Sequence, residues 1–169
     1  MNPKIILRKI SLEDCVKISQ AFSEQSWNKA VSQYQLYVQY QEQGIRDVII
    51  AEFEGVFAGY LTIHWKSDYT AFREKGIPEV VDLNVLKKFQ RKGIASRLME
   101  EAESRIKKVS PFAGIGFGLT KDYGAAQILY INRGYKPDGN GLVKNSRSLS
   151  YGEQVTVGDD LVFYLIKSL

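Results

Sequence analysis

Four basic side chains surround a turn that joins an apolar run to an amphipathic segment. They are Lys87, Lys88, Arg91 and Lys92, and Gly93 follows them. The first backbone N–H groups of a helix have no intrahelical partners and lie at the positive end of the helix dipole, so an anion placed there is bound by several donors at once. No Gly-Lys-Ser/Thr sequence follows, which excludes the loop that binds a nucleoside triphosphate with magnesium. These residues predict a site for the phosphates of a cofactor, without a metal.

Two motifs at and beyond this turn carry a family resemblance. Gln90-x-x-Gly93-x-Ala95 resembles the acetyl-coenzyme A (acetyl-CoA) signature of the GNAT acetyltransferases, which is Gln or Arg, two residues, Gly, one residue, then Gly or Ala. Residues 126–135, with the sequence AQILYINRGY, are similar to the family's other hallmark, a helix that reads Ala-x-x-Leu-Tyr-x-x-x-Gly-aromatic. Both motifs stand in the family's order, which makes a chance match uncommon.

The resemblance implies how acetyl-CoA, the cosubstrate of the family, is bound. Backbone N–H groups of residues 90–95 would hold its pyrophosphate. Leu83 and Val85 would pair through their backbone with the pantetheine arm, so that the N–H of Val85 faces the thioester oxygen. Tyr123 stands where family members usually have an Asn that contacts the coenzyme, and it is kept only as a neighbour of the cofactor. The residues assigned to the cofactor in this way are Leu83, Val85, Gln90, Arg91, Lys92, Gly93, Ile94, Ala95, Tyr123, Ala126 and Tyr130.

Tyr130 matches the family position of the general acid that protonates the coenzyme thiolate. A phenol of pKa ~10 can protonate a thiolate of pKa ~8.5 if the site assists, so the role is chemically reasonable. The simpler interpretation is that Tyr130 only packs on the inner face of its helix. Leu129 and Gly134 complete the motif around Tyr130 and favour the acid.

Asp82 is the candidate base for the amine proton, because it lies on a predicted central strand a few residues from the proposed thioester site. An ordinary aspartate, with a pKa of ~3.9, is a poor base unless burial raises that value. Two alternatives stay open. Family members often use a Glu in this region or a chain of water molecules, and Asp82 could equally pair with a nearby Lys or Arg.

Aromatic residues gather in the first pair of predicted helices and in the linker that follows a predicted hairpin. Rings with carboxylates nearby would suit a cationic amine through cation–π and ionic contacts, although each ring could equally be ordinary packing. The candidates for acceptor binding are Trp27, Tyr34 and Trp65, extended by Tyr37, Tyr69 and Phe72, with Glu24, Asp68, Asp159 or Asp160 nearby. A polyamine, an aminoglycoside, an amino acid and a protein N-terminus all stay open as acceptors.

Three conspicuous features have simpler explanations. Gly114-x-Gly116-x-Gly118 looks like a dinucleotide-binding loop, but it lies inside a predicted strand and lacks a helix at the right spacing, so tight packing in a sheet is expected. His64 is the only histidine and gives almost no support to a metal site. Cys15 is expected to be a buried structural thiol.

The 169 residues fit one domain, here residues 1–169, and 44% hydrophobic with 25% charged residues is typical of a globular protein. Residues 87–108 hold eight Lys or Arg against three Glu, so this patch accounts for the net charge of +4 and suits one cofactor better than nucleic acid. A signal-like apolar core and an apolar run of ~20 residues are both absent from the sequence. We therefore expect a cytoplasmic monomer or homodimer without nucleic-acid or membrane partners.

The first half of the chain predicts strands and helices in alternation. Residues 5–10 and 79–85 read as strands, and residues 47–53 and 56–65 as an antiparallel hairpin around Glu54-Gly55. Ser11 is expected to cap a first helix, residues 28–42 to form a second, and residues 66–78 to form a linker. The apolar positions of the two helices are Leu12, Cys15, Ile18 and Phe22, then Val31, Tyr34 and Val38.

The second half predicts two more helices. The helix after Gly93 has its apolar residues four apart, at Ile94, Leu98, Ala102 and Ile106. A strand over residues 114–119 should precede a helix over 123–133 that Asp122 caps and Gly134 ends. Residues 138–152 are expected to be a loop, and 154–157 with 161–166 a hairpin around Gly158.

This order of elements predicts a mixed α/β fold with a largely antiparallel, twisted sheet flanked by helices, and the GNAT resemblance implies that the sheet splays at its central strands. The leading interpretation is an acetyl-CoA-dependent N-acetyltransferase. Its acceptor, the primary amine of a small molecule or peptide, would attack directly in a ternary complex. The alternative is a non-catalytic acyl-CoA binding or sensing module on the same fold. A small basic nucleic-acid binder is a third interpretation, and no known module supports it.

Overall fold

The computed structural model describes residues 4–169, which form two compact units. Unit 1 is the described part of Met1–Trp65 with Val81–Ser104, and unit 2 is Lys66–Val80 with Arg105–Leu169. Within the described residues, eight strands are hydrogen-bonded in the order β1-β2-β3-β4-β5-β8-β6-β7. The pairs β1–β2, β2–β3, β5–β8, β6–β8 and β6–β7 are antiparallel, and β4–β5 is parallel. The predicted mixed α/β fold with a largely antiparallel sheet is confirmed.

Unit 1 is built on the strands β1 (Ile5–Lys9), β2 (Arg46–Phe53), β3 (Val56–His64) and most of β4 (Glu79–Val85). The hairpin between β2 and β3 turns at Glu54 and Gly55, which both have positive φ, 51° and 82°. Two residues with positive φ are typical of the hairpin turn whose twist matches the flanking strands. The predicted hairpin is therefore confirmed.

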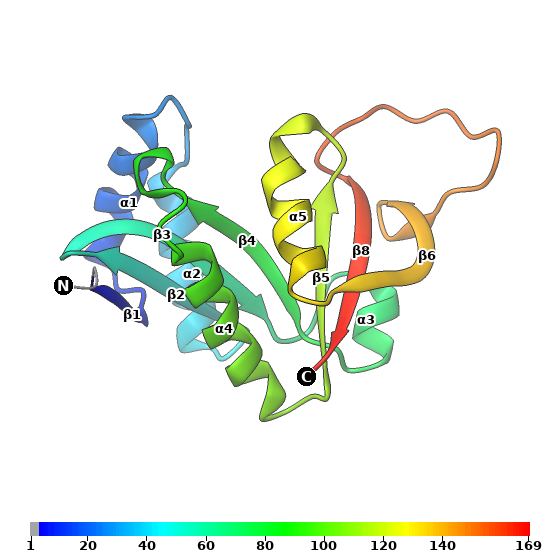
Figure 1. Ribbon diagram of the computed structural model, residues 1–169, viewed down its shortest axis with the longest axis horizontal. Coiled ribbons are helices and arrows are strands. Elements are labelled where there is room, and N and C mark those ends of the chain that lie inside the picture. Colours follow the sequence, from blue (N-terminus) through cyan, green and yellow to red (C-terminus); the bar gives the residue numbers. More distant parts are fainter. Residues whose placement is uncertain (1–3) are drawn as a thin grey trace. The chain divides into compact units, whose positions relative to one another are not determined.

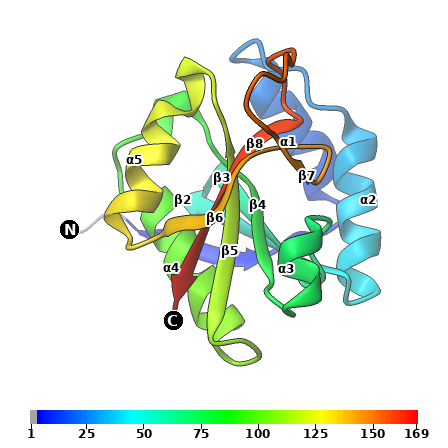
Figure 2. The same ribbon diagram turned by 90° about the vertical axis from the view of Figure 1, so that its right-hand side faces the viewer.

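The helices of unit 1 cover both faces of its strands. Figures 1 and 2 show α1 (Asp14–Ser23) and α2 (Val31–Glu42) on one face and α4 (Ile94–Lys107) on the other. The alternation of a strand divides the buried β2 side chains between the two faces, and Val48 and Ile50 belong to the cluster with α1 and α2. The residues predicted for the apolar face of α4, Ile94, Leu98, Ala102 and Ile106, are all buried.

The start of α1 differs from the prediction. The Ser11 side chain caps no helix; instead its backbone N–H and its hydroxyl both donate to Asp14 Oδ2, at 2.8 and 2.9 Å. The helix begins at Asp14, and Leu12, predicted on the apolar face, is 63% exposed. Only half of a capping box is present: the Asp14 carboxylate accepts from the Ser11 N–H, but the Ser11 hydroxyl donates to the same carboxylate instead of accepting from a backbone N–H.

Unit 2 contains β5 (Phe112–Gly118), β6 (Lys136–Lys144), β7 (Arg147–Ser148) and β8 (Leu161–Ser168), with the first two residues of β4 paired to β5. Figure 2 shows α5 (Gly124–Asn132) and α3 (Thr70–Glu74) on opposite sides of these strands. A Cβ at Gly114 would lie 2.3 Å from the Phe72 ring, and one at Gly116 would lie 2.7 Å from Val162. Tight packing in the sheet is confirmed for these glycines.

Three predictions in unit 2 are wrong. The expected linker contains α3, the expected loop contains β6, and Gln154–Val157 is not a strand. β6 carries Gly139 and Gly141 at positive φ, and its pairing with β8 shifts register between Pro137 and Leu142. From its local composition, such a segment is predicted to be a loop. In the structure it is a strand because its backbone pairs with β8.

The predicted cap of α5 is also wrong. Asp122 lies in the short 3-10 helix η2 (Lys121–Tyr123), where it accepts a hydrogen bond from Thr120, and it does not cap α5. The predicted end of the helix is confirmed, since Gly134 has φ = 88° and its N–H donates to Ile131 O at 2.9 Å. None of the helices among residues 4–169 has the length and apolar character that crossing a membrane requires.

Candidate functional site

The turn between β4 and α4 has the geometry of an anion site. After the 3-10 helix η1 (Lys87–Phe89), Arg91 and Gly93 take positive φ, 60° and 79°, and α4 begins at Ile94. A Cβ added to Gly93 would meet nothing within 4 Å, so the space beside the turn is open. A side chain at this position would nevertheless be strained, because φ is positive. The turn thus presents exposed backbone at the start of a helix, where phosphate binds readily.

The basic side chains of this turn are only lightly engaged. Lys92 Nζ lies 5.0 Å from the centroid of the Phe53 ring, and Lys88 Nζ lies 3.7 Å from a carboxylate oxygen of Glu24. Arg91 forms no hydrogen bond or ion pair with any part of the chain between residues 4 and 169. Because these cations are exposed and available, the turn fits the phosphates of a coenzyme.

The end of β4 runs close against β3. A Cβ at Gly59 would lie 2.5 Å from the backbone oxygen of Asn84 and 3.0 Å from Val85 Cα, so only glycine permits this approach. The Gln90 side chain reaches back toward Val85 O at 3.5 Å, and Leu83 and Val85 are half-buried. Ile94 is buried in the core, so any part that it takes in binding a cofactor comes from its backbone.

Asp82 is the centre of a polar network that sequence reasoning did not foresee. It has φ = 59°, which is uncommon for a residue inside a strand. Its Oδ2 accepts hydrogen bonds from Tyr60 OH at 2.6 Å, Tyr37 OH at 2.9 Å and Gln33 Nε2 at 3.3 Å. Its Oδ1 accepts one from Asn84 Nδ2 at 2.6 Å, so the carboxylate accepts four hydrogen bonds, three at Oδ2 and one at Oδ1.

The tyrosines around Asp82 are held in their protonated form. Burial, followed by the charge of Asp82, raises the pKa of Tyr37 to about 12. The same two causes raise the pKa of Tyr60 further, and burial raises that of Tyr34, whose hydroxyl lies 3.5 Å from Tyr60 OH. These phenols therefore stay hydrogen-bond donors over the whole physiological range.

Lys29 completes this network. Its ammonium lies 3.6 Å from Asp82 Oδ1 and 3.3 Å from Tyr60 OH. The same ammonium lies 5.3 Å from the centroid of the Phe22 ring and 5.8 Å from that of Tyr60. Asp82 is thus paired with a lysine, which is one of the two arrangements that the sequence left open.

The structure separates the residues predicted for acceptor binding. Tyr34 and Tyr37 join the Asp82 network, and Trp27 stacks on Phe22 with ring centroids 5.9 Å apart. Trp65 instead donates to Asp47 at 3.2 Å. Tyr69 and Phe72 belong to a core cluster of unit 2, and Asp160 lies 3.3 Å from Lys144. Sequence reasoning missed Lys29 because it falls at the polar start of the predicted helix over residues 28–42, whereas α2 begins at Val31. It missed Tyr60 because that residue lies in an apolar strand.

Unit 2 holds the second motif. Tyr130 is 5% exposed on α5, and its ring lies 6.3 Å from that of Tyr135. Tyr123 packs against Gly118, where an added Cβ would lie 2.4 Å from its ring, and Ala126 is half-buried. Burial of Tyr130 fits the inner-face packing that was its simpler interpretation, and a buried phenol can also serve as a proton donor.

Unit 2 also buries a carboxylate that sequence reasoning did not single out. Glu79, at the start of β4, is 9% exposed and accepts a hydrogen bond of 2.5 Å from Ser67 Oγ. The N–H of Tyr69 in turn donates to Ser67 Oγ at 3.0 Å. The strand periodicity could have flagged Glu79 as a charged residue in a buried strand.

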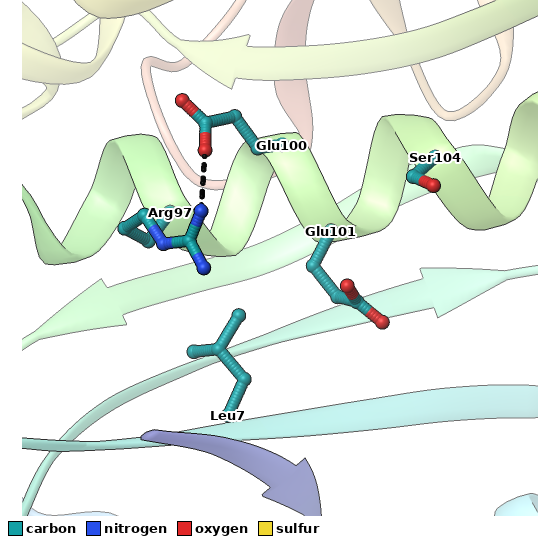
Figure 3. A pocket seen from close by; sticks show the side chains of 5 residues that line it. All are labelled: Leu7, Arg97, Glu100, Glu101 and Ser104. Atoms are coloured by element: carbon teal, nitrogen blue, oxygen red, sulfur yellow. Dashed lines mark hydrogen bonds and ion pairs between the residues drawn. The ribbon is translucent and has the colours of Figure 1, made fainter. Parts of the chain in front are cut away.

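A shallow polar groove lies elsewhere in unit 1, between β1 and α4. Figure 3 shows its lining, with Leu7 below and the α4 side chains above, and its volume is about 230 Å³. Arg97 and Glu100 form an ion pair of 3.0 Å along its rim. None of the predicted site residues lines this groove, and among residues 4–169 no group of three or more potential metal ligands is placed to bind a metal.

Solved structures with a similar fold include proteins described as acetyltransferases. The protein yncA of Salmonella typhimurium, solved with its cofactor acetyl-CoA, is 16% identical with a TM-score of 0.66, over 97% of this chain and 93% of that one. An N-acetyltransferase of Staphylococcus aureus Mu50 is 14% identical with a TM-score of 0.71, over 98% of each chain. A ribosomal-protein-alanine N-acetyltransferase of Brucella melitensis is 18% identical with a TM-score of 0.66, over 97% and 99%. At these identities the likeness shows the fold.

Sequence comparisons decide the family. A search of curated proteins finds no match for this chain. The sequence model of one protein family, in contrast, matches residues 12–135, a segment that contains both motifs and most of the two units. Enzymes of this family use acetyl-CoA as their cosubstrate. By this match, the chain belongs to the acetyltransferase (GNAT) family.

Proposed function

We propose that this chain is an N-acetyltransferase, formed by residues 1–169 as one domain, that transfers the acetyl group of acetyl-CoA directly to a primary amine of a small molecule or peptide. Family membership supports an acetyl-CoA-dependent acetyltransferase. The observation that carries the proposal is the open Arg91–Gly93 turn at the start of α4, with its lightly engaged cations. The Asp82 network supports an amine as the acceptor, because its carboxylate already holds an ammonium.

Different groups of residues would hold the different parts of acetyl-CoA. Backbone N–H groups of residues 90–95, with Arg91 and Lys92, would hold the pyrophosphate, and the backbone of Leu83 and Val85 would hold the pantetheine arm. Acetyl-CoA supplies an activated acetyl group as a thioester. The Val85 N–H would donate to the carbonyl oxygen as negative charge develops on it. Tyr123 and Ala126 would lie beside the cofactor.

Two residues would move protons. Asp82 would receive the proton of the attacking amine at Oδ1, which accepts one hydrogen bond, from Asn84, and lies 3.6 Å from the Lys29 ammonium. The Tyr130 hydroxyl would donate its proton to the departing sulfur. Glu79 is a buried alternative for the base. If the pH–rate profile of Asp82→Asn stays normal, the base lies elsewhere.

A calorimetric titration of acetyl-CoA tests the cofactor site. The wild type should bind in the micromolar range, and Gly93→Asp should lose binding, because it adds a carboxylate where the phosphates would lie. Gly44→Asp is the matched control: Gly44 also has positive φ, 69°, and open space around it, so it imposes the same strain far from the turn. Absence of binding to the wild type would remove both the enzyme and the acyl-CoA sensor as functions.

Tyr130→Phe tests the general acid and separates the enzyme from the sensor. Removal of the hydroxyl should lower turnover by roughly 10²-fold or more and leave acetyl-CoA binding nearly intact. Thiol release under saturating acceptor measures the first effect, and calorimetry the second. Unchanged turnover would remove the role of Tyr130. A wild type that binds acetyl-CoA but releases no thiol with any amine would favour the sensor.

A further inference from the structure

The Lys29 ammonium is bound by the kinds of group that recognise an alkylammonium ligand. Phe22 and Tyr60 present their rings within cation–π distance, and Asp82 and the Tyr60 hydroxyl present oxygen atoms. We call Phe22, Tyr60 and Asp82 the ammonium cage. Lys29 and Asp82 are 20% and 19% exposed, so the cage is largely desolvated but reaches the surface.

Lys29 is held loosely in this cage. An ammonium has three donors, yet that of Lys29 makes one hydrogen bond within residues 4–169, the long one of 3.3 Å to Tyr60. Its distance of 3.6 Å to Asp82 is an ion pair beyond ordinary hydrogen-bond range. The cage walls, by contrast, are fixed, since Asp82 keeps four hydrogen bonds to other side chains. The Lys29 ammonium is therefore easier to displace than the walls of the cage are to rearrange.

The segment that carries Lys29 also touches the proposed phosphate turn. Residues 24–30 join α1 to α2, and Gln25 Oε1 accepts a hydrogen bond from the Lys87 N–H at 2.9 Å. Lys87 Nζ lies 5.4 Å from the centroid of the Trp27 ring, and Lys88 pairs with Glu24. The same short segment thus fills the cage and contacts the residues that would meet a cofactor.

We propose that the ammonium cage is the binding site for the acceptor, and that Lys29 occupies it as an internal stand-in until the acceptor displaces it. The acceptor class is then a primary alkylammonium at the end of an unbranched chain, such as a lysine side chain or a terminal polyamine nitrogen. Lys29 itself enters by its four-carbon stem, so the cage fits this shape. Asp82 of the cage lies on the strand that holds Leu83 and Val85, and the role of the cage as acceptor site rests on the proposed function.

An NMR titration with n-butylammonium chloride, the side-chain amine of lysine, tests the cage without turnover. Lys29→Ala should vacate the site and bind n-butylammonium at least about tenfold more tightly than the wild type. Lys29→Met should gain nothing, because its side chain still fills the space, and Lys17→Ala, an exposed lysine of α1, controls for the lost charge. Neutral 1-butanol, and alaninamide with its ammonium on a branched carbon, should show no gain.

Equal affinity in Lys29→Ala and the wild type would overturn the proposal. Lys29→Ser, which vacates the same space with a residue common in turns, serves as a second variant if Lys29→Ala does not fold. Failure of both to fold would also overturn it, because Lys29 would then be a structural residue. The proposed function fails separately, on the acetyl-CoA titration of the wild type, and the n-butylammonium result stands whatever that titration gives.

Discussion

Arg8 and Lys29 both pair with carboxylates in unit 1, but the two pairs are built differently. Arg8 donates to both oxygens of Asp14 at 2.7 Å and to Glu52 at 2.8 Å. Lys29 reaches Asp82 only at 3.6 Å. A planar guanidinium with two parallel hydrogen bonds gives a fixed geometry, whereas an ammonium on a flexible stem behaves as a point charge. The Arg8–Asp14 pair therefore stabilises the fold, whereas the Lys29–Asp82 pair has the geometry of an exchangeable contact.

The Arg8 network connects three elements of unit 1. Arg8 lies on β1, Asp14 begins α1, and Glu52 lies on β2. Burial of Asp14 opposes its ionisation, but the hydrogen bonds from Arg8 and from Ser11 outweigh it and lower the pKa of Asp14. The Lys29 network instead joins a connecting segment to a strand whose carboxylate is satisfied without it.

Removal of the Arg8 guanidinium should have the largest effect on stability. Arg8→Met leaves Asp14 ionised and nearly buried without its main partner, and should lower the free energy of unfolding by about 2 kcal/mol. Urea denaturation measures this loss. Arg97→Met is the control, because the Arg97–Glu100 pair is mostly exposed, and it should change stability by less than about 0.5 kcal/mol. Equal losses in the two variants would contradict the structural role of Arg8.

The same network predicts a dependence of stability on pH. Since the pKa of Asp14 is lower in the folded protein than in the unfolded chain, its contribution is complete above the unfolded value of ~3.9 and is lost as the pH falls through the folded value. Urea denaturation between pH 6 and pH 2.5 should show this loss. The decline should be smaller in Arg8→Met, and an equally steep decline there would assign the effect to other carboxylates.

Tyr60→Phe should have an intermediate effect. The buried hydroxyl donates to Asp82 at 2.6 Å, and the loss of a hydrogen bond to a charged group should cost about 1.5 kcal/mol. Thermal denaturation of Tyr40→Phe provides a control, because the Tyr40 side chain on α2 makes no such contact with the described residues. If Tyr60→Phe loses no more thermal stability than Tyr40→Phe, the hydrogen bond from Tyr60 to Asp82 does not stabilise the fold.

Lys29→Met should have the smallest effect, less than about 0.5 kcal/mol. The methionine keeps the apolar contacts of the stem with Phe22, and Asp82 keeps its other hydrogen bonds. Urea denaturation beside Arg8→Met makes the contrast direct. A loss of unfolding free energy as large as that of Arg8→Met would show that the Lys29–Asp82 pair also stabilises the fold. It would contradict the difference inferred between the two pairs.

The sequence predicted those features that depend on neighbouring residues. The Glu54-Gly55 hairpin, the apolar face of α4 and the end of α5 at Gly134 all follow from local turn chemistry or periodicity, and all are confirmed. The cap at Ser11 failed although it is local, because the Ser11 hydroxyl donates to the Asp14 carboxylate instead of accepting from a backbone N–H. β6 failed because its partner strand, β8, is far away in the sequence.

The sequence by itself determined the family, the phosphate turn at Gly93 and the presence of Asp82 on a strand beside it. Only the tertiary structure decided what surrounds that carboxylate. Phe22, Lys29, Tyr37 and Tyr60 come from α1, a connecting segment, α2 and β3, and none of them is near Asp82 along the chain. Turn and helix signals act over a few residues, whereas a cage for an ammonium is assembled by packing between elements, which no local pattern records.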